Sequence, residues 1–371
     1  MLAEEFVGVL REHGINFYTG VPDSFLKEVL NYINFKFESE NLIAANEGNA
    51  VALAAGHYLS TGKPALCYMQ NSGIGNAINP ILSLLDPMVY GIPVLFLIGY
   101  RGKSGLKDEP QHKKQGLVTE ELLSTAGIEY KVINSEFTKN ELSEILSCKL
   151  PEMKATGKSF AFVAEKNTFD EYVFTPEKSP YKLDRERAIE IVAENLKDFW
   201  FVSTTGHISR ELFEIRERKK EIHDRDFLTV GSMGHSSMIA FGIAKNHLNK
   251  KIAVLDGDGA LIMHMGAMST IGASDLSDFF HIVFNNGAHD SVGGLPTKGF
   301  DISFKETAKA LGYDYAESVS DEISLKNFLS ESRKGKIFLE IRVKKGARKN
   351  LGRPTLSTFE MKEKFMKSLE G

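Results

Sequence analysis

The chain has 371 residues and a formal net charge of −4, and 25% of its residues are charged. That length allows two domains with cores of their own, and the charge gives no reason to expect a nucleic acid or an anionic membrane as partner. Its two cysteines, Cys67 and Cys148, supply neither a disulfide framework nor an iron–sulfur ligand set, and no apolar run approaches the roughly 20 residues of a membrane span. We therefore expect a cytoplasmic protein without a signal peptide.

Short apolar runs that end in glycine or in polar turns alternate with helical patterns along the whole chain. Helical patterns cover, for example, residues 49–60 and 186–196. This alternation predicts an α/β fold in which parallel sheets are covered by helices on both faces. The runs predicted as strands are, in chain order, 16–19, 42–45, 65–69, 94–98, 159–164, 200–203, 227–230, 252–255, 281–284 and 337–343.

Two halves of similar length are separated by a stretch that contains Pro176 and Pro180 and has no clear period. We therefore predict two doubly wound parallel-sheet domains without a middle domain. The tail that begins at Lys344 is basic at first and then helical, and it either packs on the surface or covers a site. The predicted boundaries are 1–168 for the first domain, 169–183 for the linker and 184–371 for the second domain with its tail.

Three polar loops follow strands of the first half, where open α/β sheets bind their ligands. They begin at Asp23-Ser24, at Asn71-Ser72-Gly73 and at Arg101. The third, predicted over residues 101–115, holds four lysines and is long for a plain connection, so it is either a lid or a solvated basic loop. His112 is its candidate acid–base group, and His289 in the second half is another.

Glu47 lies between the apolar strand 42–45 and a helical stretch of small residues, 50–56. A carboxyl group at such a strand end is expected to be buried, and burial raises its pKa. The alternative is a helix N-terminal acid that is stabilised by the helix dipole.

In the second half, Gly257-Asp258-Gly259 ends the strand 252–255, and Asn285-Asn286 follows the strand 281–284 after a gap of 25 residues. Aspartate and asparagine side chains supply the oxygen ligands that Mg²⁺ prefers. The glycines let the backbone approach a diphosphate closely, and a helix starting just after Gly259 would direct N–H groups at it. The spacing therefore predicts a metal and diphosphate site.

With these motifs and Glu47, the chain resembles the thiamine-diphosphate-dependent 2-oxoacid decarboxylases across nearly its whole length. The resemblance implies a pyrimidine-binding first domain and a diphosphate-binding second domain of the thiamine-diphosphate-binding fold. The middle domain that the family often carries is missing here. Three segments are most similar to short two-domain members whose 2-oxoacids carry a phosphonate or sulfonate group: residues 20–24, 108–112 and 287–294.

The resemblance also implies roles for individual residues. Asp258, the Asn286 side chain and the Ala288 carbonyl would bind Mg²⁺, and Glu47 would bond the pyrimidine ring. Met233 would support the two rings of the cofactor, although methionine is also a common core residue. Further residues implied at the cofactor are Ser72, Thr205, Gly206, Gly231, Gly257, Gly259 and Ala260. Those implied at the substrate are Asp23, Ser24, Asn71, Arg101, His112 and Arg353, of which Asp23, Ser24 and His112 would share the catalytic work with Glu47.

The implied reaction is the decarboxylation of 3-phosphonopyruvate to phosphonoacetaldehyde and CO2, in phosphonate biosynthesis. Cations of the loop 101–114, aided by Lys298 and Arg353, would bind the anionic group, but their composition does not separate a phosphonate from a sulfonate. The alternatives are a sulfopyruvate decarboxylase or another 2-oxoacid decarboxylase or carboligase. The two isolated cysteines argue against a 2-oxoacid:ferredoxin oxidoreductase subunit. A thiamine-diphosphate-binding sensor or scaffold is the alternative from a different class.

In this family the cofactor lies between the first domain of one chain and the second domain of another. The resemblance therefore implies a homodimer or a larger homo-oligomer, with Glu47 of one chain facing Asp258 of its partner.

Overall fold

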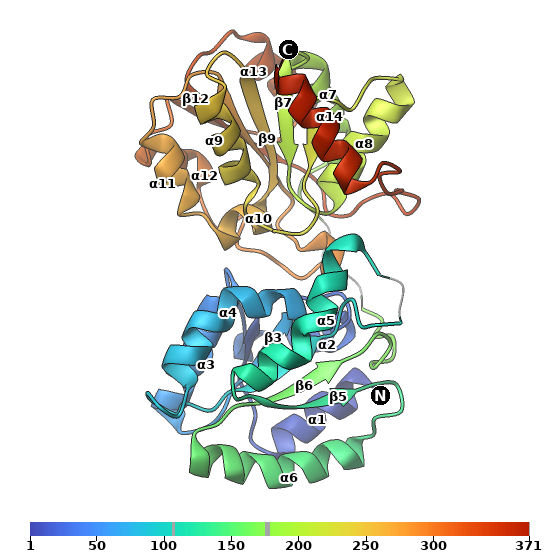
Figure 1. Ribbon diagram of the computed structural model, residues 1–371, viewed down its shortest axis with the longest axis vertical. Helices are drawn as coiled ribbons and strands as arrows, with labels where there is room; N and C mark the ends of the chain where they lie inside the picture. The colour runs from blue at the N-terminus through green and yellow to red at the C-terminus, as the bar shows by residue number, and fades with distance from the viewer. Residues whose placement is uncertain (106–107, 175–178, 371) are drawn as a thin grey trace. The chain divides into compact units, whose positions relative to one another are not determined.

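The computed structural model describes residues 1–105, 108–174 and 179–370. The chain divides into two compact units, Met1–Pro176 and Glu177–Gly371. Each unit is built on its own six-stranded sheet, and all strand pairs in both sheets are parallel (Figure 1). The predicted α/β class with two parallel-sheet domains is therefore confirmed.

In the first unit, helices cover both faces of the sheet. Val51, Ile74 and Leu123 belong to one buried cluster on one face, and the Phe6 ring lies 6.4 Å from the Phe162 ring on the other. The sheet order is β2-β1-β3-β4-β6-β5. The strands are β1 (Tyr18–Gly20), β2 (Asn41–Ile43), β3 (Leu66–Gln70), β4 (Leu95–Gly99), β5 (Glu129–Ile133) and β6 (Phe160–Ala164). The helices are α1 (Ala3–Glu12), α2 (Lys27–Lys36), α3 (Glu47–Thr61), α4 (Ile74–Pro80), α5 (Pro110–Thr125) and α6 (Lys139–Thr156), with short helical turns η1 (Glu38–Glu40), η2 (Asn71–Gly73) and η3 (Ile81–Leu85).

The second unit repeats this layout, with the sheet order β11-β12-β10-β9-β7-β8. Its strands are β7 (Phe199–Ser203), β8 (Asp226–Leu228), β9 (Lys251–Gly257), β10 (Phe279–Asn285), β11 (Tyr315–Val319) and β12 (Lys336–Arg342). Its helices are α7 (Arg185–Asn195), α8 (His207–Lys219), α9 (Ser236–Asn246), α10 (Asp258–Met263), α11 (Ala267–Gly272), α12 (Phe304–Ala310), α13 (Glu322–Ser330) and α14 (Thr358–Glu370), with the short turn η4 (Asp290–Val292).

Both sheets have the same strand order. When the strands of each unit are numbered from one in chain order, each sheet reads 2-1-3-4-6-5. The direction in which the chain winds reverses between the first and third strands, which are β1 and β3 in one unit and β7 and β9 in the other. Open α/β sheets bind ligands at the carboxyl ends of strands beside such a reversal. Both units therefore present a ligand-binding edge.

Two strands, β5 and β11, were not predicted from the sequence, and they hold the same edge position in the two sheets. Both are only partly buried: Glu129 in β5 and Tyr315 in β11 are exposed. Edge strands have one neighbour and one open side, so they lack the continuous apolar run that marks the central strands.

The segment predicted as a linker is divided between the two units, and each part bonds within its own unit. On the first, the Asp170 N–H donates to the Met1 carbonyl at 3.0 Å and the Tyr172 N–H to the Glu28 carboxylate at 2.8 Å. On the second, the Lys344 N–H donates to the Leu183 carbonyl at 2.9 Å. Residues 175–178, which include Pro176, lie outside the described residues.

The basic tail is held by acidic residues at α7 and α8. Lys344 pairs with Asp184 at 2.5 Å, and Arg348 pairs with Glu186 at 2.9 Å and with Glu214. After this stretch, α14 contacts β8 at the sheet edge.

This last helix contributes to both faces of the second sheet. Met361 joins the buried cluster of α7, α8 and α13, whereas Phe365 joins the cluster of α9 to α12. The Phe365 ring lies 5.5 Å from the Phe227 ring of β8. The helix α14 therefore lies across the β8 edge.

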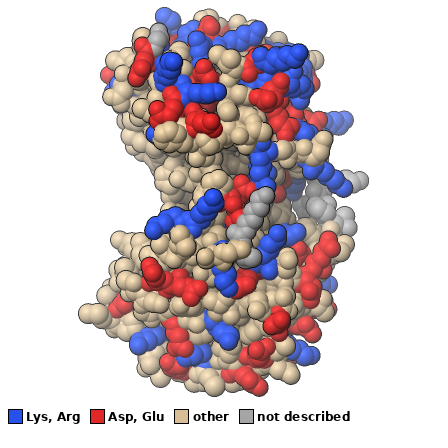
Figure 2. Space-filling model, turned by 45° about the vertical axis from the view of Figure 1, so that its right-hand side comes forward, with Lys and Arg blue, Asp and Glu red and all other residues tan. Residues whose placement is uncertain are grey.

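On the face shown in Figure 2, lysines and arginines alternate with acidic residues over both units and do not gather into one large basic area. Within the described part of the chain, no helix combines the length and the apolar character that crossing a membrane requires.

Candidate active site

Glu47 is the first residue of α3, directly after β2, and the helix is capped by Asn46, whose side chain accepts the Asn49 N–H at 2.9 Å. The Glu47 side chain is buried, with 5% of its surface exposed, and its carboxylate accepts from the Asn76 Nδ2 at 2.8 Å. Burial raises the pKa of Glu47, and the Asn76 hydrogen bond offsets only part of that rise. Such a carboxyl readily keeps or shares a proton.

The turn η2 lies directly against this carboxyl. A Cβ atom on Gly73 would lie 2.5 Å from the Glu47 Oε1 atom, which is closer than side chains tolerate. Any larger residue at this position would therefore displace the Glu47 side chain, which the close approach of Gly73 restricts from one side.

Asp23 follows β1 and is fully buried. Its carboxylate accepts from the Gln70 Nε2 at 2.7 Å and from the Phe25 N–H at 2.8 Å, and the Ser72 hydroxyl donates to the Gln70 Oε1 at 2.7 Å. Burial raises the pKa of Asp23 despite these hydrogen bonds. A chain of polar side chains therefore joins the ends of β1 and β3.

Arg101 follows β4 and reaches the β1 loop. Its Nη1 donates to the Ser24 hydroxyl at 2.9 Å, and its Nε and Nη2 bind both oxygens of Asp108 at 2.8 and 2.5 Å. Burial alone would raise the pKa of Asp108, but the Arg101 guanidinium holds that pKa well below its usual range. The Arg101 charge is therefore largely compensated within the protein.

The predicted loop 101–115 is shorter than expected, because residues from Pro110 onward form the helix α5. Proline is favoured in the first helical turn, where its missing N–H costs no hydrogen bond, and the glutamines and lysines that follow are good helix formers. The polar composition that suggested a loop marks a polar helix start instead. Leu106 and Lys107 lie outside the described residues.

His112 therefore lies in the first turn of α5 and not in a loop. It is 8% exposed, and its Nδ1 has no hydrogen-bond partner among the described residues. Burial and the nearby Arg101 lower the pKa of His112 to about 4, so its ring is neutral at pH 7. Asn71 contacts the start of the segment that leads to His112, since its Nδ2 donates to the Arg101 carbonyl at 2.7 Å.

The other cations of residues 101–114 have different surroundings from those of Arg101. Lys103 pairs with Glu165, and Lys113 and Lys114 are exposed on α5. Among the described cations of this segment, Arg101 is the one that bonds the Ser24 hydroxyl. Arg353 is exposed on the tail of the second unit, and Lys298 is exposed and pairs with Asp301 at 3.3 Å.

In the second unit, Asp258 follows β9 and is 3% exposed. Its carboxylate accepts a hydrogen bond from the Thr297 hydroxyl, and burial raises the pKa of Asp258 to about 6. The helix α10 begins at Asp258 itself, with Gly257 as N-cap, two residues earlier than predicted. Thr297 was not predicted, because it reaches Asp258 from a loop with no recognisable motif.

The two asparagines at the end of β10 differ in their contacts. Asn285 is fully buried, and its Nδ2 donates to the Gly299 carbonyl and to the Glu340 carboxylate, both at 2.7 Å, while its Oδ1 accepts the Gly287 N–H at 3.1 Å. Asn285 therefore holds the loop in place. Asn286 donates from Nδ2 to Asp290 at 2.6 Å, and its Oδ1 accepts only the Ala288 N–H at 3.0 Å among the described residues.

Ala288 lies in a narrow hairpin opposite Pro296. The flanking hydrogen bonds join His289 to Leu295 at 2.8 Å and Thr297 to Gly287 at 3.1 Å. In an antiparallel pair of this kind, the peptide groups of the residue between the bonds point away from the opposite strand. The Ala288 carbonyl is thus turned outward from the hairpin.

The ends of β7 and β8 complete this edge. Gly206, with φ of 100°, is the N-cap of the 13-residue helix α8, and the Thr205 hydroxyl accepts the Gly231 N–H at 3.1 Å. Met233 is half-buried in the tight turn that follows Gly231.

A Cβ atom on Gly259 would lie 2.9 Å from the His289 ring, so the ring packs directly against the backbone of α10. Ala260 is buried in the next position of the helix.

These residues fit a magnesium ion and a diphosphate. Asp258, Asn286 and Ala288 offer a carboxylate, an amide and a carbonyl oxygen, which are the hard donors that Mg²⁺ takes. Within the described ranges, no three or more His, Cys, Asp or Glu side chains gather into a group that could hold a metal ion. The N-terminus of α8 suits phosphate oxygens.

Comparison with known proteins gives matches in both units of the chain. Residues 1–123 match the thiamine pyrophosphate enzyme N-terminal TPP binding domain, and residues 204–342 match the C-terminal TPP binding domain. The chain is 31% identical to the phosphonopyruvate decarboxylase of Streptomyces viridochromogenes, over 98% of this chain and 94% of that protein. It is 29% identical to the phosphonopyruvate decarboxylase of Streptomyces hygroscopicus, over 98% of this chain and 92% of that protein.

A third relative is the beta subunit of sulfopyruvate decarboxylase from Methanococcus maripaludis, which is 32% identical over 51% of this chain and 99% of the subunit. Both TPP binding domains are thus matched in order on one chain, and a relative at 31% identity is matched along 94% of its length. The chain belongs to the thiamine pyrophosphate enzymes, within their group of decarboxylases.

Proposed function

We propose that this protein decarboxylates 3-phosphonopyruvate to phosphonoacetaldehyde and CO2, with thiamine diphosphate and Mg²⁺ as cofactors. The observation that carries the reaction is the buried Glu47 carboxyl with its raised pKa on the same chain as the oxygen donors Asp258 and Asn286. The choice of substrate is supported by the two phosphonopyruvate decarboxylases, which align with nearly the whole chain. When bound, thiamine diphosphate supplies the electron sink for the loss of CO2 from a 2-oxoacid.

In this proposal, Glu47 holds a proton at the pyrimidine N1′ atom. Burial raises the pKa of this carboxyl and so favours its protonated form, and the Asn76 hydrogen bond leaves Oε1 as the oxygen that faces Gly73. A carboxyl group that was exposed to water would be ionised and would share a proton poorly.

The second unit binds the other end of the cofactor. Asp258, the Asn286 oxygen and the Ala288 carbonyl hold Mg²⁺, and the backbone around the N-terminus of α8 receives the diphosphate. The residues proposed to line the cofactor there are Thr205, Gly206, Gly231, Met233, Gly257, Gly259 and Ala260.

For the substrate, we assign the polar network at the ends of β1, β3 and β4. Arg101 and Ser24 are the proposed partners of the phosphonate, because the guanidinium and the hydroxyl already lie 2.9 Å apart. Asp23 and His112 lie at the reacting end, where a buried acid and a neutral imidazole can donate or accept a proton. Asn71 orients the Arg101 backbone, and Arg353 of the tail stays a proposed further cation.

The proposal includes a homodimer or a larger homo-oligomer, in which Glu47 of one chain serves the metal site of another, as the family resemblance implies. It also includes a cytoplasmic setting, which agrees with the free thiols of Cys67 and Cys148.

The experiment offers the protein phosphonopyruvate, sulfopyruvate and pyruvate and measures aldehyde release with and without thiamine diphosphate and Mg²⁺. We expect kcat/KM to be highest for phosphonopyruvate and to require both cofactors. A preference for sulfopyruvate would favour the second candidate, which the M. maripaludis relative supports. Binding of thiamine diphosphate without release of any aldehyde would instead favour a sensor or scaffold.

A further inference from the structure

Asp290 connects three segments that are far apart in the sequence. It begins the turn η4, four residues after Asn286. Its Oδ2 atom accepts from the Asn286 Nδ2 at 2.6 Å, from the Arg185 Nη1 at 3.0 Å and from the Gly346 N–H at 2.9 Å. One carboxylate oxygen thus joins the predicted metal loop, the start of α7 and the start of the tail.

Arg185 is itself held in place by a second carboxylate, that of Glu211. Only 6% of its surface is exposed, and it donates from Nε and Nη2 to both oxygens of Glu211 on α8, at 2.8 and 3.0 Å. These carboxylates raise the pKa of Arg185 although burial acts in the opposite direction. A buried guanidinium held by a bidentate carboxylate has little freedom, so it is a rigid anchor for Asp290.

The carboxylate of Asp290 determines which way the Asn286 amide points. An amide nitrogen only donates and an amide oxygen only accepts, whereas an ionised carboxylate only accepts. The nitrogen of Asn286 must therefore face Asp290, and its oxygen is left on the side of the Ala288 N–H. Without Asp290, the Ala288 N–H is the one remaining hydrogen bond that holds this orientation among the described residues, and an amide that turned over would present its NH2 group, which repels a cation.

We propose that Asp290, anchored by Arg185 and the Gly346 N–H, is a positioning residue that fixes the Asn286 amide with its oxygen toward Mg²⁺. This inference rests on the proposed function, which assigns Asn286 to the metal. Hydrogen-bond partners behind metal ligands typically change metal affinity by about 10- to 100-fold when they are removed.

The test measures the Mg²⁺ dissociation constant by calorimetric titration at a fixed thiamine diphosphate concentration, with no substrate present. We expect Asp290→Ala to weaken Mg²⁺ binding by about 10- to 100-fold. Asp290→Asn keeps the side-chain volume and replaces the alanine variant in the test if that variant does not fold. Its Mg²⁺ dissociation constant should lie between those of the wild type and Asp290→Ala.

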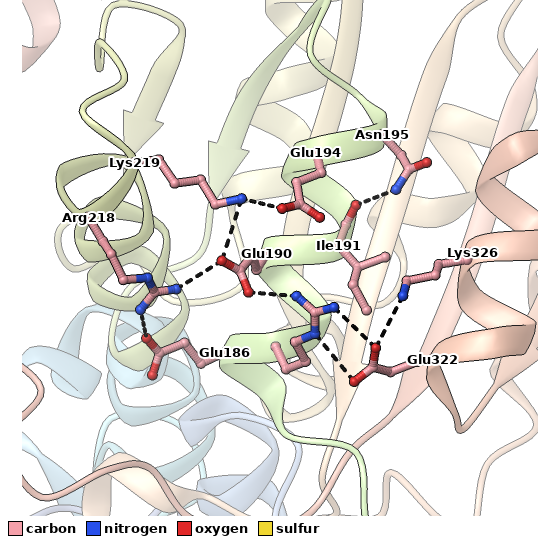
Figure 3. A network of polar contacts seen from close by, with 10 residues as sticks. Glu186, Glu190, Ile191, Glu194, Asn195, Arg218, Lys219, Glu322 and Lys326 are labelled. Atoms are coloured by element: carbon pink, nitrogen blue, oxygen red, sulfur yellow. Dashed lines mark hydrogen bonds and ion pairs between the residues drawn. The ribbon is translucent and has the colours of Figure 1, made fainter.

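The matched control is Glu190→Ala on α7. Glu190 also accepts from three cationic groups, Arg187 at 2.7 Å, Arg218 at 3.2 Å and Lys219 at 3.5 Å (Figure 3). No bond joins it to Asn286 among the described residues, so its loss should leave the Mg²⁺ affinity unchanged.

A second variant background, Asn286→Asp, distinguishes positioning of the Asn286 amide from a general structural role of Asp290. In Asn286→Asp, the metal ligand has two equivalent oxygens and needs no orientation. The loss of the Asp290 charge acts in both backgrounds, so Asp290→Ala should weaken Mg²⁺ binding much less in Asn286→Asp than in the wild-type background. An equal loss of affinity in both backgrounds would overturn the positioning role.

The proposed function and this inference fail in different ways. If Asp258→Ala abolishes Mg²⁺ binding while Asp290→Ala and Asp290→Asn keep the wild-type dissociation constant, the metal site stands and the positioning role is wrong. If Asp258→Ala also binds Mg²⁺ as the wild type does, the metal site is wrong and this inference falls with it.

Discussion

Glu47, Asp23 and Asp258 are buried carboxyls whose pKa values are raised by burial. Asp108 has the opposite shift, because the Arg101 guanidinium contacts both of its oxygens. Burial therefore favours the protonated form of these three carboxyls, whereas the Arg101 guanidinium keeps Asp108 ionised. Raised carboxyl pKa values at strand ends are typical of functional sites.

The raised pKa of Asp258 gives metal binding a defined pH dependence. Mg²⁺ competes with the proton for this carboxylate, so affinity should be constant above pH 6 and fall by about tenfold per pH unit below it, since the pKa is about 6. Calorimetric Mg²⁺ titrations between pH 5 and pH 8, at fixed thiamine diphosphate, check this.

The same shift has a consequence for the metal-free protein. The folded state binds this proton more tightly than the unfolded state, in which the pKa is near the ordinary value of 3.8. The contribution of Asp258 to stability is therefore lost as pH rises from about 4 to about 6. The difference in melting temperature between wild type and Asp258→Asn should change across this window, and a pH-independent difference would contradict the shift.

Arg101 and Lys103 provide a matched pair for the substrate assignment. Arg101→Gln should raise the KM for phosphonopyruvate by roughly ten- to a hundredfold, since a charge-assisted contact contributes about 1.5–3 kcal/mol. Lys103→Gln removes the pair with Glu165 and the contact of Lys103 with the Tyr100 ring, and it should leave this KM near the wild-type value. Steady-state kinetics with phosphonopyruvate and pyruvate test both, and equal effects of the two substitutions would contradict the assignment.

At the level of secondary structure, the sequence pattern predicted the central strands because they are continuous apolar runs buried on both faces. It did not predict β5 and β11, whose edge positions leave residues such as Glu129 exposed. It also read the polar start of α5 as a loop, because lysine and glutamine are compatible with either structure. Strand ends were predictable because apolar runs end there, and so the positions of Glu47 and Asp258 could be foreseen.

Partners that reach the site from loops were not predictable. Thr297 and Asp290 contact Asp258 and Asn286 through folded geometry, and no spacing in the sequence marks those contacts.

The turn η2 makes a prediction about Glu47. Gly73→Ala would place a Cβ atom 2.5 Å from the Glu47 Oε1 atom and displace the carboxyl, so kcat should fall toward the value of Glu47→Gln, which we expect to be about 10²-fold below wild type. Gly75→Ala is the control, because its Cβ meets nothing within 4 Å. Steady-state kinetics would compare Gly73→Ala with Gly75→Ala, and melting temperatures would show whether either variant is destabilised. Wild-type kcat in Gly73→Ala would show that the turn does not position Glu47.

For the whole molecule, the shared strand order means that both units present the carboxyl ends of the same four strands to a ligand. In the first unit these are β2, β1, β3 and β4, which lead to Glu47, Asp23, Asn71 and Arg101. In the second they are β8, β7, β9 and β10, which lead to the Gly231, Gly206, Asp258 and Asn286 segments. The common topology was not visible in the sequence, because it requires the pairing of strands and not only their positions.

The position of α14 across the β8 edge has a consequence for solubility. An uncovered edge strand offers unpaired N–H and C=O groups to another chain, and here it would also uncover the Phe227 ring that Phe365 contacts. A chain that ends at residue 357 should therefore self-associate progressively with concentration. Light scattering across a dilution series checks this, with Phe359→Ser as the control, since that side chain of α14 is already 66% exposed. By covering the β8 edge, the C-terminal helix would then limit aggregation of the protein.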